Sequence, residues 1–149
     1  MNVCDSGDLL PVEEAIAQLL AQAPPPPSTE VIPLAQALGR VVAEEVFSPL
    51  DLPGWDNSAM DGYALRAFDV PEQGGHLEVA GRIAAGHSSD EPLQAGQAVR
   101  IFTGAPLPPG ADSVVAQERC RVYGQRIWCP PIRLGDHVRK RGEELQRGQ

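Results

Sequence analysis

Glycine and proline together make up one fifth of this 149-residue chain, 15 of each, where roughly 12% is usual. From about residue 60 they separate short runs rich in Val, Ile, Tyr and Phe. This spacing is typical of a small barrel or sandwich rather than a helical bundle. We predict strands at 61–66, 77–83, 98–102, 113–117 and 121–123. We expect the last of these to form a hairpin with a strand at 126–129, across Gly124-Gln125.

The segments on either side of this β region follow another pattern. Residues 11–20 predict a helix with Asp8 as N-cap, whose apolar residues share one face: Val12, Ile16, Leu19 and Leu20. Residues 24–27 are a stiff polyproline spacer, and a short helix at 33–38 that ends at Gly39 precedes an extended segment at 40–46. The tail from residue 134 carries little apolar content to anchor it.

The predicted fold is mainly β with an α+β arm. We expect a small barrel-like or sandwich-like domain inserted between an N-terminal helical and extended arm and a C-terminal returning segment. The predicted parts are 1–52 (helix, proline spacer and extended arm), 53–132 (β domain) and 133–149 (returning arm). The apolar helix face needs a surface to pack on: the β domain, another chain, or a further C-terminal region.

Charge and hydropathy exclude several classes of function. The net charge of −8 argues against nucleic-acid binding, which needs clustered cations. Five of the twelve cations fall within the last 17 residues, where they either hold an anionic substrate or form a solvated tail. No apolar run approaches 18 residues and no secretory signal is present, so we expect a cytoplasmic protein without a membrane partner.

Cysteine and histidine spacing matches no metal-ligand pattern. Cys4, Cys120 and Cys129 lack the C-x-x-C arrangement and are odd in number, which predicts neither a zinc site nor a disulfide framework. The three histidines lie far apart in sequence, and we expect all of them on the surface: His76, His87 and His137.

Two stretches carry the chemistry. The first, 53–66, packs four polar side chains into six residues that can bind a cation or orient a polar substrate: Asp56, Asn57, Ser58 and Asp61. The alternative is that Asp61-Gly62 only makes a turn. The aromatic and sulfur residues of this stretch are expected in the core: Trp55, Met60 and Tyr63.

In the second stretch, 100–112, Thr103 follows an apolar strand and precedes Gly104. A hydroxyl and open backbone N–H groups can approach an anion there. The alternative is an ordinary strand-ending threonine. We expect Arg100 to be a surface ion-pair partner.

Five motifs occur in a fixed order: 38–41 (LGRV), 48–53 (SPLDLP), 56–64 (DNSAMDGYA), 100–115 (RIFTGAPLPPGADSVV) and 139–144 (RKRGEE). Together they resemble the N-terminal part of the molybdopterin molybdenumtransferases, the family that includes the gephyrin E domain. The resemblance covers nearly the whole chain. It identifies a family whose α/β and small β-barrel domains follow the segment present in these 149 residues, so we expect the chain to be the N-terminal portion of a longer protein.

The resemblance implies the last step of molybdenum cofactor synthesis. Family members are homodimers that cleave adenylylated molybdopterin with Mg²⁺ and insert molybdate, in a site between the β domain of one subunit and the α/β domain of the other. It implies catalytic roles for Asp61 and Thr103, with Asp61 holding Mg²⁺ through water or receiving a proton. It also implies substrate contacts from Asn57, Ser58, Arg139 and Arg141, the first two chiefly by pinning the loop.

One position departs from the family pattern. Many members end the last motif in Gly-Glu-Asp, with the Asp implicated in catalysis, whereas this chain has Gly142-Glu143-Glu144. Glu144 keeps the charge but moves the carboxylate by about one C–C bond, which matters for a positioned catalytic group. A second function therefore stays open: a non-catalytic dimerisation or binding module derived from this family.

Overall fold

The computed structural model describes residues 10–25 and 27–149, and the chain divides into two units between Glu45 and Val46. In the first unit, α1 spans Val12–Ala21 and a 3₁₀ turn, η1, spans Leu34–Gln36. Glu13 and Glu14 lie in the first turn of the helix, where their negative charge interacts favourably with the positive end of the helix dipole. Asp8, predicted as its N-cap, lies outside the described residues, and the position before the first helical residue is Pro11, which makes no side-chain cap bond.

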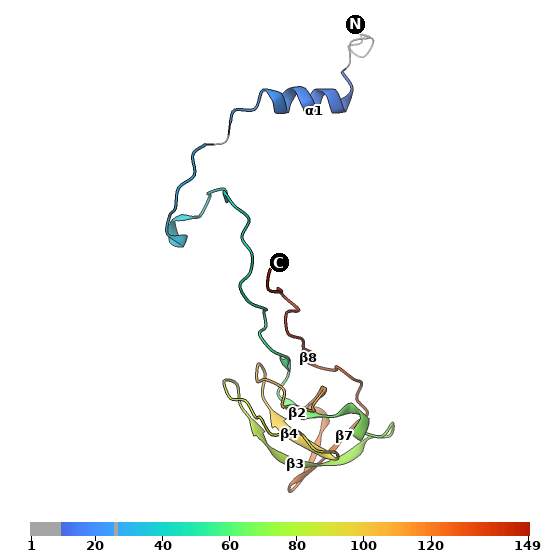
Figure 1. The fold of residues 1–149 in the computed structure, drawn as a ribbon. Coiled ribbons are helices and arrows are strands. Elements are labelled where there is room, and N and C mark those ends of the chain that lie inside the picture. The colour runs from blue at the N-terminus through green and yellow to red at the C-terminus, as the bar shows by residue number, and fades with distance from the viewer. Residues whose placement is uncertain (1–9, 26) are drawn as a thin grey trace. The chain divides into compact units, whose positions relative to one another are not determined.

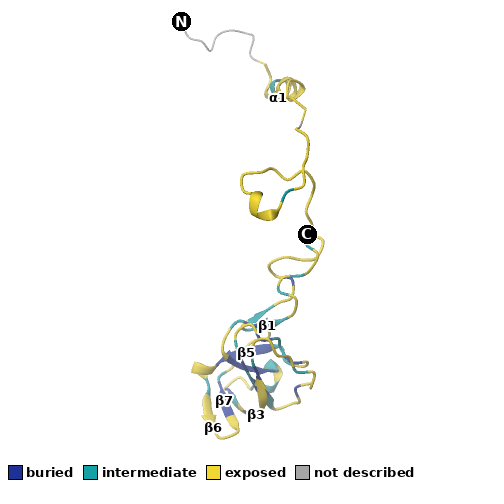
Figure 2. Ribbon diagram, turned by 90° about the vertical axis from the view of Figure 1, so that its left-hand side faces the viewer, coloured by how far each residue is buried: buried dark blue, intermediate teal, exposed yellow. Residues whose placement is uncertain are grey.

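The predicted apolar face of α1 is exposed. None of its residues is buried, and Leu19 and Leu20 are 71% and 70% exposed (Figure 2). The predicted extended segment at 40–46 forms no strand and bends at Ala43-Glu44. No helix of the described residues is long and apolar enough to cross a membrane.

The second unit is a curled six-stranded sheet that forms a half-barrel, as the sequence predicted (Figure 1). Its strands lie in the order β5-β2-β4-β3-β7-β6, and only the β3–β4 pair is parallel. Their bounds are β2 Gly62–Leu65, β3 Gly75–Ile83, β4 Gln97–Ile101, β5 Ser113–Ala116, β6 Arg121–Tyr123 and β7 Arg126–Cys129. Short 3₁₀ turns, η2 Ala67–Asp69 and η3 Gln117–Arg119, follow β2 and β5.

Both faces of β2 and β5 are covered, and these two strands are apolar at nearly every position. All four residues of β2 are buried, and so are all four of β5. Tyr63 and Leu65 pack in one cluster with Leu77 and Ile127, while Ala64 packs on the other face with residues such as Ile101. Alternate residues of one strand therefore serve two cores.

A two-stranded sheet that the sequence did not predict joins the C-terminal segment to the stretch 53–66. It pairs β1, Asn57–Ser58, with β8, Val138–Arg139. Backbone bonds continue this pairing outward, from Leu52 N–H to Leu145 O at 2.7 Å and from Ser48 N–H to Gln149 O at 3.0 Å. The returning segment is anchored by main-chain hydrogen bonds, so its low apolar content does not leave it a free tail. The predicted part boundaries at 52 and 132 stay predictions.

Three residue-level expectations need correction or support. Tyr63 is in the core at 8% exposure, but Trp55 and Met60 are exposed (58% and 38%) because their loop lies at the edge of the sheet. The histidines are exposed, as predicted. Arg100 forms no ion pair with a described carboxylate, since its guanidinium group donates instead to the Gly62 carbonyl and stacks on Phe102.

Candidate functional site

The stretches 53–66 and 100–112 meet at Asp61 and Thr103, which are 42 residues apart in the chain. Oδ1 of Asp61 accepts the backbone N–H of Thr103 at 2.9 Å and its hydroxyl at 2.8 Å. Asp61 is the last residue before β2, and Thr103 follows the neighbouring strand β4 by two residues. Adjacent antiparallel strands thus deliver a carboxylate and a hydroxyl to the same end of the sheet.

This carboxylate is exposed and held in its charged form. The hydrogen bonds from Thr103, the backbone N–H first and the hydroxyl second, hold the pKa of Asp61 below its usual value, and the charge of Arg100 acts in the same direction. Oδ2 of Asp61 accepts no hydrogen bond from the described residues. One oxygen is fixed while the other faces solvent, which suits a group that must meet a ligand.

Gly62, next to Asp61, is the first residue of β2 and not part of a turn. A Cβ at this position would lie 2.0 Å from the Val115 carbonyl oxygen on β5. Only a residue without a side chain lets the two strands pair at this spacing. The Asp-Gly sequence therefore reflects close strand approach, which corrects the turn interpretation.

Asn57 and Ser58 are buried below the exposed carboxylate. Ser58 is fully buried, and its hydroxyl donates to the Met60 carbonyl at 2.6 Å. Its backbone binds the stretch 100–112, because its N–H donates to Ala105 O and its carbonyl accepts from Gly104 N–H. Pinning the loop is the role that this geometry supports for Ser58.

Asn57 is 4% exposed and donates its amide to the Trp55 carbonyl at 3.3 Å. Its side-chain oxygen is buried without a hydrogen-bond partner among the described residues. An unpaired buried acceptor costs roughly 1–3 kcal/mol. The contact that the structure shows for the Asn57 side chain is therefore the one from its amide to the loop.

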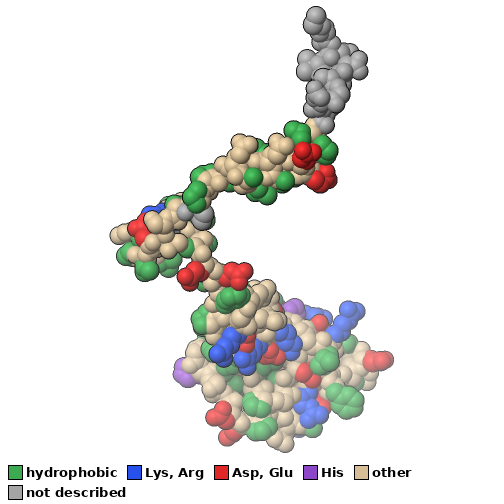
Figure 3. Space-filling model, turned by 45° about the horizontal axis from the view of Figure 1, so that its top comes forward, with side chains coloured by type: hydrophobic (Ala, Val, Ile, Leu, Met, Phe, Trp, Pro, Cys, Tyr) green, Lys and Arg blue, Asp and Glu red, His purple; other side chains and the backbone are tan. Residues whose placement is uncertain are grey.

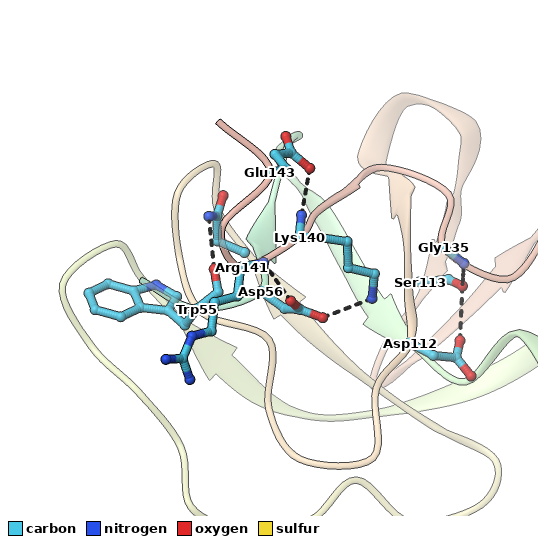
Figure 4. A network of polar contacts seen from close by, with 9 residues as sticks. Trp55, Asp56, Asp112, Ser113, Gly135, Lys140, Arg141 and Glu143 are labelled. Carbon is cyan, nitrogen blue, oxygen red and sulfur yellow. Dashed lines mark hydrogen bonds and ion pairs between the residues drawn. The ribbon is translucent and has the colours of Figure 1, made fainter. Parts of the chain in front are cut away.

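Residues 140 and 141 of the returning segment bind Asp56 of the stretch 53–66, as Figure 4 shows. Asp56 accepts the ammonium group of Lys140 at 2.8 Å and the backbone N–H of Arg141 at 2.8 Å. The Arg141 side chain pairs with Asp51. In Figure 3, blue and red side chains accordingly lie side by side on this unit.

These contacts hold two further carboxylates in their charged form. The Lys140 ammonium, then the Arg141 N–H, lowers the pKa of Asp56. The backbone N–H of Arg147, then the Arg141 side chain, lowers the pKa of Asp51. Lys140 and Arg141 are therefore matched to acids of the same chain and are not free for an anion unless they exchange partners.

Arg139 and Glu144 form an ion pair with each other, and Glu143 pairs with Arg139 as well. Arg139 lies opposite Asn57 in the β1–β8 pair, which places this ion pair beside the stretch 53–66. Glu144 makes no hydrogen bond to Asp61 or Thr103. The structure thus joins Asp61 with Thr103 and Arg139 with Glu144, as two neighbouring but separate pairs.

Sequence reasoning missed two ion pairs, Lys140 with Asp56 and Arg141 with Asp51. All four residues belong to the quoted motifs, so the opposite charges of these motifs were the available signal. No group of three or more His, Cys, Asp or Glu within the described ranges can hold a metal ion. Asp61 is thus not part of a three-ligand cluster among the described residues, and its Oδ2 accepts no hydrogen bond there.

Comparison with known proteins places this fold and these motifs among the molybdenum cofactor biosynthesis proteins. The family model described as MoeA N-terminal region (domain I and II) matches residues 10–149, and the chain belongs to that family.

The relatives agree with this assignment. The molybdopterin molybdenumtransferase of Nostoc sp. is 46% identical over 125 residues, which cover 80% of this chain and 29% of the relative. The Haemophilus influenzae protein of the same name is 37% identical, with 94% and 35% covered. A crystal structure of the molybdopterin biosynthesis moeA protein from Pyrococcus horikoshii OT3 matches with a TM-score of 0.80 and 34% identity, over 95% of this chain and 38% of that one. The chain spans about a third of the length of the curated relatives it matches.

Proposed function

We propose that this chain is the N-terminal part of a molybdenum insertase, which forms molybdenum cofactor from adenylylated molybdopterin and molybdate. The chain contributes one wall of a composite site in a homodimer. The observation that carries the proposal is the exposed Asp61 carboxylate, held by both donors of Thr103 at 2.9 and 2.8 Å. Both donors bind one oxygen, Oδ1, and Oδ2 accepts no hydrogen bond from the described residues, whereas both oxygens of Asp51 and of Asp56 accept one.

Within this proposal Asp61 meets the substrate and Thr103 positions it. Because the pKa of Asp61 is lowered, the group is a carboxylate at neutral pH and can accept a proton or orient a water molecule. Thr103 donates both its N–H and its hydroxyl to Asp61, so it acts through that residue.

Mg²⁺ fits this site only with ligands from elsewhere. Asp61 can offer Oδ2, directly or through water, and no cluster of described residues adds to it. Mg²⁺ commonly binds one or two carboxylates and completes its octahedron with waters and substrate phosphates. When bound it would neutralise phosphate charge, while Asp61 orients one edge of its shell.

Five further residues have supporting roles in the proposal. Asn57 and Ser58 shape the loop beside the substrate. Arg139 and Arg141 bind anionic parts of the substrate by exchanging their present carboxylate partners. Glu144 supplies the carboxylate of the last motif once Arg139 releases it.

The test is Asp61→Asn in the full-length protein, with turnover of adenylylated molybdopterin as the readout. The amide retains an oxygen that accepts both Thr103 donors, so the fold is expected to persist while turnover falls at least about a hundredfold, the usual scale for a general acid–base group. Asp90→Asn, on an exposed turn, is the matched control and keeps full activity. Undiminished turnover by Asp61→Asn would remove Asp61 from the mechanism.

A second candidate function is a non-catalytic dimerisation or binding module. The exposed apolar face of α1 favours it, because a helix with four large exposed apolar side chains needs a partner surface: Val12, Ile16, Leu19 and Leu20. Light scattering on the 149-residue chain, with Leu19→Glu as the comparison, tests this role. A monomer in both samples would leave the module without its interaction.

A further inference from the structure

Two arginines stack on one aromatic ring beside the Asp61–Thr103 pair. Arg82 of β3 and Arg100 of β4 are direct partners in the parallel register. Their guanidinium carbons lie 4.7 and 4.3 Å from the centroid of the Phe102 ring, well inside the ~6 Å range of cation–π contacts. Phe102 immediately precedes Thr103. Two positive charges therefore gather at the edge of the candidate site.

No described carboxylate forms an ion pair with either arginine. Arg100 is held in place by bonds from its guanidinium group to the Gly62 and Ile101 carbonyls and to the Gln117 side chain. Arg82 is exposed and donates to none of the described residues, so all five of its N–H groups are available. Like charges directly opposite each other in a sheet are destabilising, and in this pair no ion pair with a described carboxylate relieves the repulsion.

The surroundings of the pair are polar. A hollow of about 280 Å³ adjoins Arg82, and its other lining residues include His87, Ser88 and Ser89, with Glu91 as its one carboxylate. Arg100 lines a second hollow together with Glu78, and its charge acts on Asp61. None of these carboxylates forms an ion pair with Arg82 or Arg100, so the donors of Arg82 stay free for a ligand.

We propose that Arg82 and Arg100 form a subsite for a tetrahedral oxyanion, either the phosphoryl group of a phosphate ester or a free oxyanion such as molybdate. Guanidinium forks suit such groups because two parallel N–H donors match two oxygens. Phe102 holds both forks side by side, and the bound anion removes their mutual repulsion. The inference rests on the proposed function for the physiological ligand, but the stacked guanidinium groups and the free donors of Arg82 are features of the residues themselves.

The experiment is a titration of the 149-residue chain at low salt and constant ionic strength with AMP, inorganic phosphate or sodium molybdate. Binding is followed by calorimetry and by the rise in Tm that a native-state ligand produces. Wild-type chain is expected to bind at least one of the three, and Arg82→Gln to bind about tenfold more weakly, as loss of one charge-assisted contact predicts. Arg121→Gln is the matched control, since Arg121 also stacks on an aromatic ring, Trp128 at 5.7 Å, away from the pair.

Tighter binding of AMP than of the inorganic ions assigns the subsite to an esterified phosphate, and tighter binding of molybdate assigns it to the free oxyanion. Arg82→Lys keeps the charge and loses the fork, so it serves as a second variant should Arg82→Gln be poorly folded. Unchanged affinity in both Arg82 variants, or no binding of any probe by wild type, overturns the subsite. Either result leaves the Asp61 turnover test untouched, because that test uses another residue, another readout and the full-length protein.

Discussion

Replacing Gly62 by alanine should destabilise the β unit more than the same change at the strand glycines Gly75 and Gly81. The new Cβ would lie 2.0 Å from the Val115 carbonyl oxygen and 2.9 Å from its carbonyl carbon, and both atoms are backbone. No side-chain rotation relieves such a contact. The β2 and β5 backbones have to separate by more than 1 Å, roughly, to reach an ordinary contact distance of ~3.5 Å or more.

Separation on this scale weakens the ladder that pairs Gly62 through Leu65 with β5. Overpacking of a core costs about 1–3 kcal/mol when side chains can adjust, and a backbone contact belongs at or above the upper end. We expect Gly62→Ala to lower the free energy of unfolding by about 3 kcal/mol or more. For a unit of this size that corresponds to a fall in Tm of at least ~12 °C.

The assay is urea unfolding of the 149-residue chain followed by circular dichroism, with Gly81→Ala as the control. Gly81 also lies in a strand, β3, but no atom would lie within 4 Å of a Cβ there. The control is expected to match wild type within about 0.5 kcal/mol, the range of substitutions without a packing effect. Equal stability of Gly62→Ala and Gly81→Ala would refute the close-approach argument.

Three further outcomes are expected. Hydrogen bonds lower the pKa values of Asp51, Asp56 and Asp61 in the folded chain, so the stability that these carboxylates add is complete above the unfolded-state value of 3.8 and is lost as the pH falls below it. Urea midpoints measured from pH 6 to pH 2.5 should therefore fall, and Asp56→Asn should make this fall shallower. Identical slopes for wild type and Asp56→Asn would contradict the assignment. In the full-length protein, Glu144→Asp should change kcat while leaving the melting temperature within a few degrees, since only an exposed ion pair is altered; an unchanged kcat would place Glu144 outside the chemistry. Burial raises the pKa of Cys120 to about 12, so iodoacetamide at pH 8.5 should label its peptide slowly in the native chain and rapidly in urea, as read by mass spectrometry; fast native labelling would exclude this burial.

The predicted strands agree with the observed ones because their signal is local. Runs such as Gly62–Leu65 and Ser113–Ala116 alternate between two cores, and glycine and proline end each run. The hairpin between β6 and β7 follows from Gly124-Gln125 in the same way. Apolar runs and turn residues are read from neighbours in sequence, so they need no knowledge of the rest of the chain.

The burial of Trp55 and Met60 was predicted wrongly for the opposite reason. Aromatic and sulfur side chains are usually buried, but whether a loop residue is covered depends on which segment lies over it. Trp55 is 58% exposed among the described residues, while Tyr63, inside β2, is buried by its neighbours across the sheet. Loop burial is a tertiary property.

The chemical character of Asp61 and Thr103 could be named from the sequence, and their pairing could not. Two residues 42 positions apart meet only because β2 and β4 are antiparallel neighbours, with Gly62 opposite Ile101. The same holds for Asp56 with Lys140 and for Arg82 with Arg100, which depend on strand order and register. Single-chain sequence contains no direct record of register between distant strands.

The amino-acid order by itself determined a glycine- and proline-punctuated β unit, a helical arm and the polar loops. Those features arise from the backbone freedom of each residue and from the periodicity of its neighbours. The tertiary structure alone decided that the C-terminal segment returns along β1, that Asp61 is held by Thr103, and that two arginines share one ring. Each of these contacts joins residues far apart in the chain, and the free energy that selects them belongs to the whole packed sheet.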